Sequence, residues 1–133
     1  MRIRSIKPEF WRSDDIVALD VFTRLLFIGL WSYVDDHGRG RYNVQLITAD
    51  LFALDSPHEA LANVSRGLQK LAATGLIVLY EVAGKCYFHI ATWTKHQRVD
   101  HPQPSRFPDP AECVTCDDGL DSLFANASRG VPE

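Results

Sequence analysis

Hydrophobic residues recur every three or four positions in the middle of the chain, a spacing typical of an amphipathic helix. Four of them share one helical face: Leu61, Val64, Leu68 and Leu71. Ser56 as N-cap, Pro57 at the first helical position and Glu59 two residues later make a capping box. Gly75 is a residue that ends helices readily. The pattern therefore predicts a helix between Ser56 and Gly75.

A β-hairpin is predicted directly after this helix. Residues 76–80 are apolar throughout, and in residues 85–90 apolar and polar positions alternate. Between these two strands, Ala83-Gly84 fits a tight turn with glycine at a left-handed position. Because the first strand is apolar on both faces, we expect it to be the inner strand of the sheet.

Two longer helices are predicted before this segment. Asp20 begins one that runs to about Val34 and is apolar around nearly its whole circumference, as in a central core helix. Asn43 caps the second, whose apolar residues share a face: Val44, Ile47, Leu51 and Leu54. A short helix is expected after Ser13.

The segment between the two longer helices is predicted to be a turn followed by a short strand. Asp35-Asp36-His37-Gly38-Arg39-Gly40 carries two glycines, which we expect at positive φ, and two carboxylates, which we expect to face solvent. Arg41-Tyr42 is expected to form a short strand that pairs with the hairpin.

This order of elements predicts an α+β fold of the winged helix-turn-helix type. It has a three-helix core, a C-terminal β-hairpin wing and an extended Pro-containing C-terminal tail. Residues 1–94 are expected to form this domain with its N-terminal arm. Residues 95–108, which have spaced prolines and no periodicity, are expected to form a basic extended strap. Residues 109–133 are expected to be an acidic, disordered tail.

Charge is unevenly distributed along the chain. Residues 1–108 contain 13 Lys or Arg and 11 Asp or Glu, whereas residues 109–133 contain 1 and 6. The net charge of −3 therefore averages a mildly basic body and an acidic tail. We expect the tail either to be solvated, or to compete with DNA for the basic body or bind a partner. No apolar run reaches the ~18 residues of a membrane span, and no signal peptide is evident, so we expect a cytoplasmic protein with reduced cysteines.

Several side chains are candidates for contact with DNA. Four polar residues of the predicted central helix face outward, where Arg can pair with guanine and Asn or Gln with adenine: Asn63, Arg66, Gln69 and Lys70. Lys85 at the tip of the wing is expected to contact phosphate or the minor groove. Further contacts to the DNA backbone are expected from five cations: Arg39, Arg41, Lys95, Arg98 and Arg106. Because the helix carries only two positive residues, it is also suited to docking a protein.

Neither a cofactor nor an enzyme activity is expected. Cys113-Val114-Thr115-Cys116 is half of a zinc site, but a structural zinc ion needs four ligands and no second pair follows. The remaining cysteine and histidines that could complete it are scattered: Cys86, His89, His96 and His101. Asp35-Asp36 beside His37 are neighbours whose side chains point apart, and no nucleotide-binding or nucleophile motif is present.

Four segments carry a resemblance to a known family: residues 1–11, 24–31, 35–40 and 93–98. They resemble small phage and prophage proteins of actinobacteria, described as helix-turn-helix DNA-binding or replication-initiation proteins. These in turn are similar to the N-terminal winged-helix domain of phage replisome organisers and DnaD-type primosome proteins. The resemblance covers roughly residues 1–108. It implies a DNA-binding protein of phage type that acts in replication initiation or transcription regulation.

The resemblance also implies candidate partners. Replisome organisers carry a further C-terminal helical domain, for which this chain has no counterpart, so we expect a stand-alone binder. Double-stranded DNA is the leading partner. The alternative is a protein-interaction or oligomerisation module that contacts a replisome or host protein and does not itself bind DNA. Phe10 and Trp11 in the N-terminal arm are expected either in the protomer's own core or exchanged in a homodimer.

Overall fold

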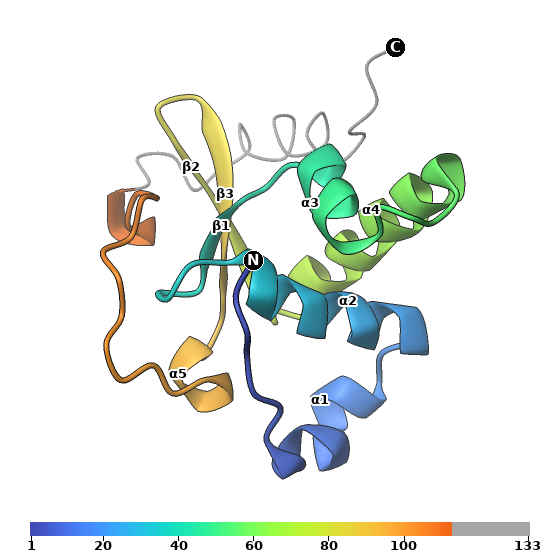
Figure 1. Ribbon diagram of the computed structural model, residues 1–133, viewed down its shortest axis with the longest axis horizontal. Helices are drawn as coiled ribbons and strands as arrows, with labels where there is room; N and C mark the ends of the chain where they lie inside the picture. The colour runs from blue at the N-terminus through green and yellow to red at the C-terminus, as the bar shows by residue number, and fades with distance from the viewer. Residues whose placement is uncertain (113–133) are drawn as a thin grey trace.

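Three helices lie on one side of a three-stranded antiparallel sheet in the computed structural model, which describes residues 1–112 (Figure 1). The helices are α2 (Val21–Tyr33), α3 (Val44–Leu51) and α4 (Pro57–Ala73). The strands are β1 (Arg39–Arg41), β2 (Ile77–Val82) and β3 (Lys85–Ile90), in the order β1-β3-β2. Four short helical elements complete the described chain: η1 (Pro8–Arg12), α1 (Asp14–Val17), α5 (Trp93–His96) and η2 (Pro110–Glu112). The predicted α+β class is confirmed.

The helices begin where the sequence predicts. The Asp20 carboxylate accepts hydrogen bonds from the backbone N–H and the hydroxyl of Thr23, at 3.3 and 2.6 Å. The Asn43 side chain accepts from Leu46 N at 3.0 Å. Each satisfies an N–H that has no partner within its helix. Helix α4 does begin at Pro57, but Ser56 makes no side-chain capping bond, so the predicted capping box is wrong.

Helix α4 ends in a glycine-based C-cap. Gly75 has a φ of 81°, its N–H donates to Ala72 O, and Leu76 N–H donates to Leu71 O at 3.0 Å. This pair of bonds is the Schellman motif, which satisfies the last carbonyls and turns the chain sharply. The turn sends the chain directly into β2.

The hairpin forms as predicted, but the predicted order of the strands is wrong. Ala83 and Gly84 have φ values of 52° and 76°, the left-handed pair that a type I′ turn requires. Strand β3 is central, since it pairs with β2 on one side and with β1 on the other. Strand β2 is an edge strand, so its prediction as the inner strand is wrong. It is apolar on both faces because Ile77 faces the core and Tyr80 lies under a later segment of the chain.

The two glycines of the loop before β1 have different roles. Gly38 has a φ of 75°, as predicted. Gly40 lies in β1 without a positive φ, so that part of the prediction is wrong. A Cβ at Gly40 would lie 3.1 Å from both the Phe88 and the Tyr33 rings. Glycine is needed here because two aromatic side chains approach the strand closely.

The core forms between α2, α4 and the inner face of the sheet. The largest fully buried side chains include Phe27, Trp31, Leu68, Phe88 and Ile90. This confirms α2 as a central core helix, although Val21 and Leu25 on it remain exposed. Phe10 from the N-terminal arm joins the core, its ring 5.3 Å from that of Trp31.

Candidate nucleic-acid interface

The four residues predicted to read DNA all lie away from the core on α4, in different surroundings. Arg66, Gln69 and Lys70 are exposed, and Asn63 is half-buried. Asn63 accepts a hydrogen bond from Arg66. Lys70 Nζ lies 2.9 Å from Asp20 Oδ1. Together with Asp20, three of the four therefore line a shallow cavity of about 190 Å³ beside the N-terminus of α2, and Gln69 does not.

Asp20 decides how much charge Lys70 presents. The Thr23 hydroxyl and the Lys70 ammonium together lower the pKa of the Asp20 carboxyl from 3.8 to about 2. The carboxylate is therefore ionised at neutral pH and neutralises the neighbouring lysine. Both side chains are about half exposed, so Lys70 can exchange Asp20 for another anion, such as a phosphate.

A close helix crossing fixes the orientation of α4. Gly67 faces α2, and a Cβ added there would lie 2.6 Å from Leu26 Cδ2. Val64, Leu68 and Leu71 are fully buried on the same side of α4. Since the inward face is set by packing, the outward position of Arg66 follows from the helical repeat.

The sheet carries a second set of basic side chains, on the face turned away from the helices. Alternate residues of a strand share a face, and β3 pairs Arg39 with His89 and Arg41 with Tyr87. Tyr80 pairs with Tyr87 from β2. We call this surface the outer sheet face. Its aromatic and basic residues are Arg39, Arg41, Tyr80, Lys85, Tyr87 and His89, and Val78 and Val82 of β2 share it.

The chain after α5 returns across the outer sheet face. We call residues 103–112 the covering segment. Tyr80 donates its hydroxyl to Pro108 O at 2.8 Å, and the Arg39 guanidinium lies 3.4 Å from both Phe107 O and the Asp109 carboxylate. The rings of Tyr87 and Phe107 lie 6.0 Å apart. As a result Tyr80, on an edge strand, is only 3% exposed.

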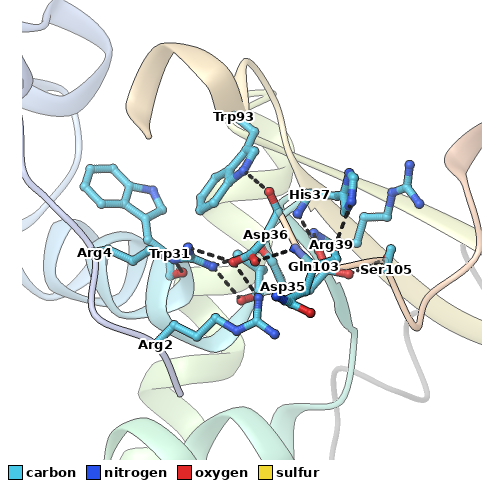
Figure 2. A network of polar contacts seen from close by, with 11 residues as sticks. Arg2, Arg4, Trp31, Asp35, Asp36, His37, Arg39, Trp93, Gln103 and Ser105 are labelled. Carbon is cyan, nitrogen blue, oxygen red and sulfur yellow. Dashed lines mark hydrogen bonds and ion pairs between the residues drawn. The ribbon is translucent and has the colours of Figure 1, made fainter. Parts of the chain in front are cut away.

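A polar network around Asp36 holds the covering segment and the N-terminal arm together (Figure 2). The Asp36 carboxylate pairs with Arg2 and with Arg4, and accepts from Gln103 N at 2.9 Å. The Arg4 guanidinium also donates to three backbone carbonyls: Trp31 (2.8 Å), Val34 (3.2 Å) and Asp35 (3.0 Å). Trp93 Nε1 donates to Asp36 O at 2.9 Å, and the guanidinium of Arg4 lies over its ring.

The prediction that Asp35 and Asp36 face solvent is wrong, because both carboxylates form hydrogen bonds with other parts of the chain. The Gln103 N–H, Arg2 and Arg4 lower the pKa of Asp36, which keeps it ionised. Asp35 accepts hydrogen bonds from the backbone N–H groups of His37 and Arg39 and from the Ser105 hydroxyl. These bonds shape the loop that leads into β1.

The other predicted phosphate contacts lie near the C-terminal part of the described chain. Lys95 is exposed on α5, which the sequence predicted as extended. Arg98 pairs with Asp100 at 3.1 Å, and both side chains are largely exposed. Arg106 is exposed within the covering segment. No hydrogen bond or ion pair between described residues joins this set to the α4 residues.

Residues outside the predicted site organise these surfaces. Arg4, Asp36 and Trp93 form the polar network, and the buried side chain of Gln97 accepts from Ser5 N at 3.0 Å. These four residues lie in three of the segments quoted above for the family resemblance, residues 1–11, 35–40 and 93–98. That resemblance is a prediction, and it was the signal that pointed to these segments. No such signal pointed to Tyr80, Tyr87 and Phe107, because a local sequence pattern shows neither the register of two strands nor where a later segment packs.

Within residues 1–112, no group of three or more His, Cys, Asp and Glu is placed to hold a metal ion. Cys86 is buried, and this raises the pKa of its thiol to about 11. Cys113 and Cys116 lie outside the described residues. No helix in the described part of the chain has the length and apolar character of a membrane span.

Comparison of the chain with protein-family models, with curated proteins and with solved structures finds no match.

Proposed function

We propose that this protein binds double-stranded DNA through a winged helix-turn-helix domain. The observation that carries the proposal is the order α2, β1, α3, α4, β2, β3 with the strand order β1-β3-β2. In this reading α3 and α4 form the helix-turn-helix, and the β2–β3 hairpin is the wing. The second helix of such a motif is the one that enters the major groove.

The side chains of α4 suit this role. Arg66 and Gln69 are exposed on a helix whose inward face is fixed, and these residue types make bidentate pairs with guanine and adenine. Lys70 would exchange its exposed carboxylate partner, Asp20, for a phosphate. The fixed outward face of α4 and the exchangeable Lys70–Asp20 ion pair favour a protein that docks on DNA by charge and distinguishes base pairs with few contacts.

Contacts to the DNA backbone would come from exposed cations beyond α4. Among the described residues, the side chains of Arg41, Lys85 and Lys95 are exposed and have no ion pair. Neutralising phosphates with such groups releases counterions, so affinity should fall steeply as salt rises. The family resemblance favours a role of this binding in replication initiation or transcription regulation, in the host cytoplasm.

The proposal is tested with two matched charge reversals in the full-length protein. Arg66→Glu changes the reading face of α4, and Arg12→Glu makes the same change at an exposed position of η1. Fluorescence anisotropy with a random-sequence duplex is measured at about 50 and 200 mM salt. We expect micromolar, salt-dependent binding that is lost in Arg66→Glu and kept in Arg12→Glu. Equal affinities for the two folded variants would refute groove reading by α4.

A second candidate function is a protein-interaction or oligomerisation module. The observation that favours it is an exposed apolar surface on α1 and α2, where Val21 is 75% and Leu25 55% exposed one turn apart. Val17 and Trp11 are also exposed. If the protein does not bind duplex at about 50 mM salt, light scattering of wild type and Val21→Lys/Leu25→Lys would test self-association, because two added charges would disrupt an apolar contact.

A further inference from the structure

We propose that the outer sheet face is a binding surface for single-stranded nucleic acid, and that the covering segment occupies it as an internal competitor. The proposal goes beyond duplex binding by α4, since both the ligand and the element that contacts it are different. It rests on the composition of the face, on the groups that the covering segment presents to it, and on how that segment is held.

The outer sheet face combines aromatic rings with flanking cations. The rings of Tyr80 and Tyr87 stack at 5.6 Å with an interplanar angle of 28°, and His89 lies 6.0 Å from Tyr80. With the covering segment in place, burial lowers the pKa of His89. Arg39 and Arg41 lie on the neighbouring strand. Proteins that bind single strands use this combination, because bases stack on the rings and cations follow the phosphates.

The covering segment presents to this face what a nucleotide would present. The Phe107 ring lies 6.0 Å from the Tyr87 ring, tilted by 55°, at the place where a base would stack. Two residues further on, the Asp109 carboxylate reaches the Arg39 guanidinium at 3.4 Å, where a phosphate would bind. Arg39 also donates to Phe107 O at the same distance. An aromatic ring and an anion on the same tyrosine–arginine pair mimic a base and its phosphate.

The covering segment is anchored in the polar network at one end and on the outer sheet face at the other. Gln103 and Ser105 are held by the carboxylates of Asp36 and Asp35, within the polar network. At the other end, Asp109 is more than half exposed, and exposed ion pairs contribute little in water. The Tyr80 hydroxyl also donates to Pro108 O, and Arg39 donates to Phe107 O. Residues 107–112 therefore leave the face only when these bonds break, while residues 103–105 stay bound.

A purely structural segment would behave differently. The covering segment buries Tyr80, and its Pro108 O accepts a hydrogen bond from the Tyr80 hydroxyl. If this were its only role, loosening the segment would only destabilise the fold. A competitor, when loosened, would also increase the affinity of the face for a single strand. The gain equals the inverse of the fraction of time that the face is open, so a face open one-tenth of the time gains roughly tenfold.

The test uses the full-length protein and a fluorescein-labelled oligodeoxythymidylate of about 12 nucleotides. Phe107→Ala/Asp109→Asn loosens the covering segment, and Asp109→Asn alone is a milder variant at an exposed position. Asp100→Asn removes the same negative charge at an exposed site outside the segment and is the matched control. We expect roughly tenfold tighter binding for the double variant, a smaller gain for Asp109→Asn, and none for Asp100→Asn.

Two further variants assign the gain to the face. Tyr87→Ala in the loosened protein should remove it, because a stacking platform is lost. Arg66→Glu should leave single-strand binding unchanged, which separates this surface from duplex binding by α4. Circular dichroism establishes that each variant is folded. If the double variant is folded and binds the oligonucleotide no better than Asp100→Asn, the proposal is wrong. If the double variant unfolds, the same comparison between Asp109→Asn and Asp100→Asn decides.

Discussion

Arg4 and Asp36 lie 32 positions apart in the sequence, yet Arg4 Nη1 is 3.2 Å from the Asp36 carboxylate. This pair links the N-terminal arm to the loop that leads into β1. Because Asp36 also accepts from Gln103 N, the same carboxylate holds the start of the covering segment. Arg4 further satisfies the C-terminal carbonyls around the end of α2. One ion pair thus connects three segments that are far apart in the chain (Figure 2).

Arg4→Ala is expected to lower the free energy of unfolding by about 2–4 kcal/mol, because it leaves Asp36 and several carbonyls without a buried donor. The Arg4 side chain is only 8% exposed. Urea denaturation followed by tryptophan fluorescence measures the change. Arg2→Ala is the control: Arg2 pairs with the same carboxylate from an exposed position, so its loss should cost less than about 1 kcal/mol. Equal effects of the two substitutions would contradict the central role of Arg4.

Gly67→Ala is expected to destabilise the protein by about 1–3 kcal/mol, although alanine favours helix, because the new Cβ would meet Leu26 of α2. Thermal unfolding measures the effect. In a Leu26→Ala background the added methyl group has room, so the penalty should disappear or change sign. A penalty that is the same in both backgrounds would contradict the close helix crossing.

The stability contributed by the Asp20 carboxylate should depend on pH. Its folded pKa of about 2 lies below the ordinary 3.8, so this stability is present above pH 3.8 and is lost as pH falls toward 2. Asp20→Asn keeps an N-capping side chain but removes the charge. We expect the variant to melt below wild type at pH 6 and the difference to vanish as pH falls through about 2. A constant difference across this range would mean that the charge is not the cause.

Cys86 should be unreactive in the native protein at neutral pH. Its pKa of about 11, against an ordinary 9.0, reduces the thiolate fraction roughly a hundredfold, and burial restricts access further. The reaction of Ellman's reagent with a Cys113→Ser/Cys116→Ser variant isolates this thiol. We expect slow labelling of the folded protein and fast labelling in denaturant. Fast labelling of the folded variant would contradict the burial of Cys86.

Lys85→Ala should weaken duplex binding evenly across sequences, if the hairpin docks on the DNA backbone. The loss of one phosphate contact should reduce the magnitude of the log-affinity against log-salt slope by about 0.9. Arg12→Ala, at an exposed position of η1, should leave the slope unchanged. Anisotropy titrations at several salt concentrations measure both. An unchanged slope in Lys85→Ala would remove the hairpin from the interface.

Local physics made several elements predictable. Asp20 and Asn43 cap helices because a side-chain oxygen reaches an N–H two or three residues ahead, and Gly75 and Gly84 take positive φ without strain. The alternation of residues 85–90 gave the correct faces of β3. The capping bond of Ser56 and the positive φ of Gly40 were not borne out, because local preferences indicate what a residue favours and packing decides which preference is used.

The candidate site was predictable only as a set of residue types. Helical periodicity places Arg66 and Lys70 outside the core, but only the packing of α4 against α2 brings Asp20 to within 2.9 Å of Lys70. Charge counting treats Arg39 as a free cation, whereas the covering segment brings Asp109 and Phe107 O next to its guanidinium. In each case the partner is distant in sequence, so no local pattern reports it.

The sequence by itself determined the α+β class, the main helices, the hairpin and its turn, because these follow from hydrophobic periodicity and from capping between near neighbours. Only the tertiary structure decided the strand order β1-β3-β2, the partners of Asp36 and the covering of Tyr80. Each of these depends on which distant segments pack together. The folding of the whole chain makes that choice, because the packing of one segment on the core determines which residues the neighbouring segments can contact.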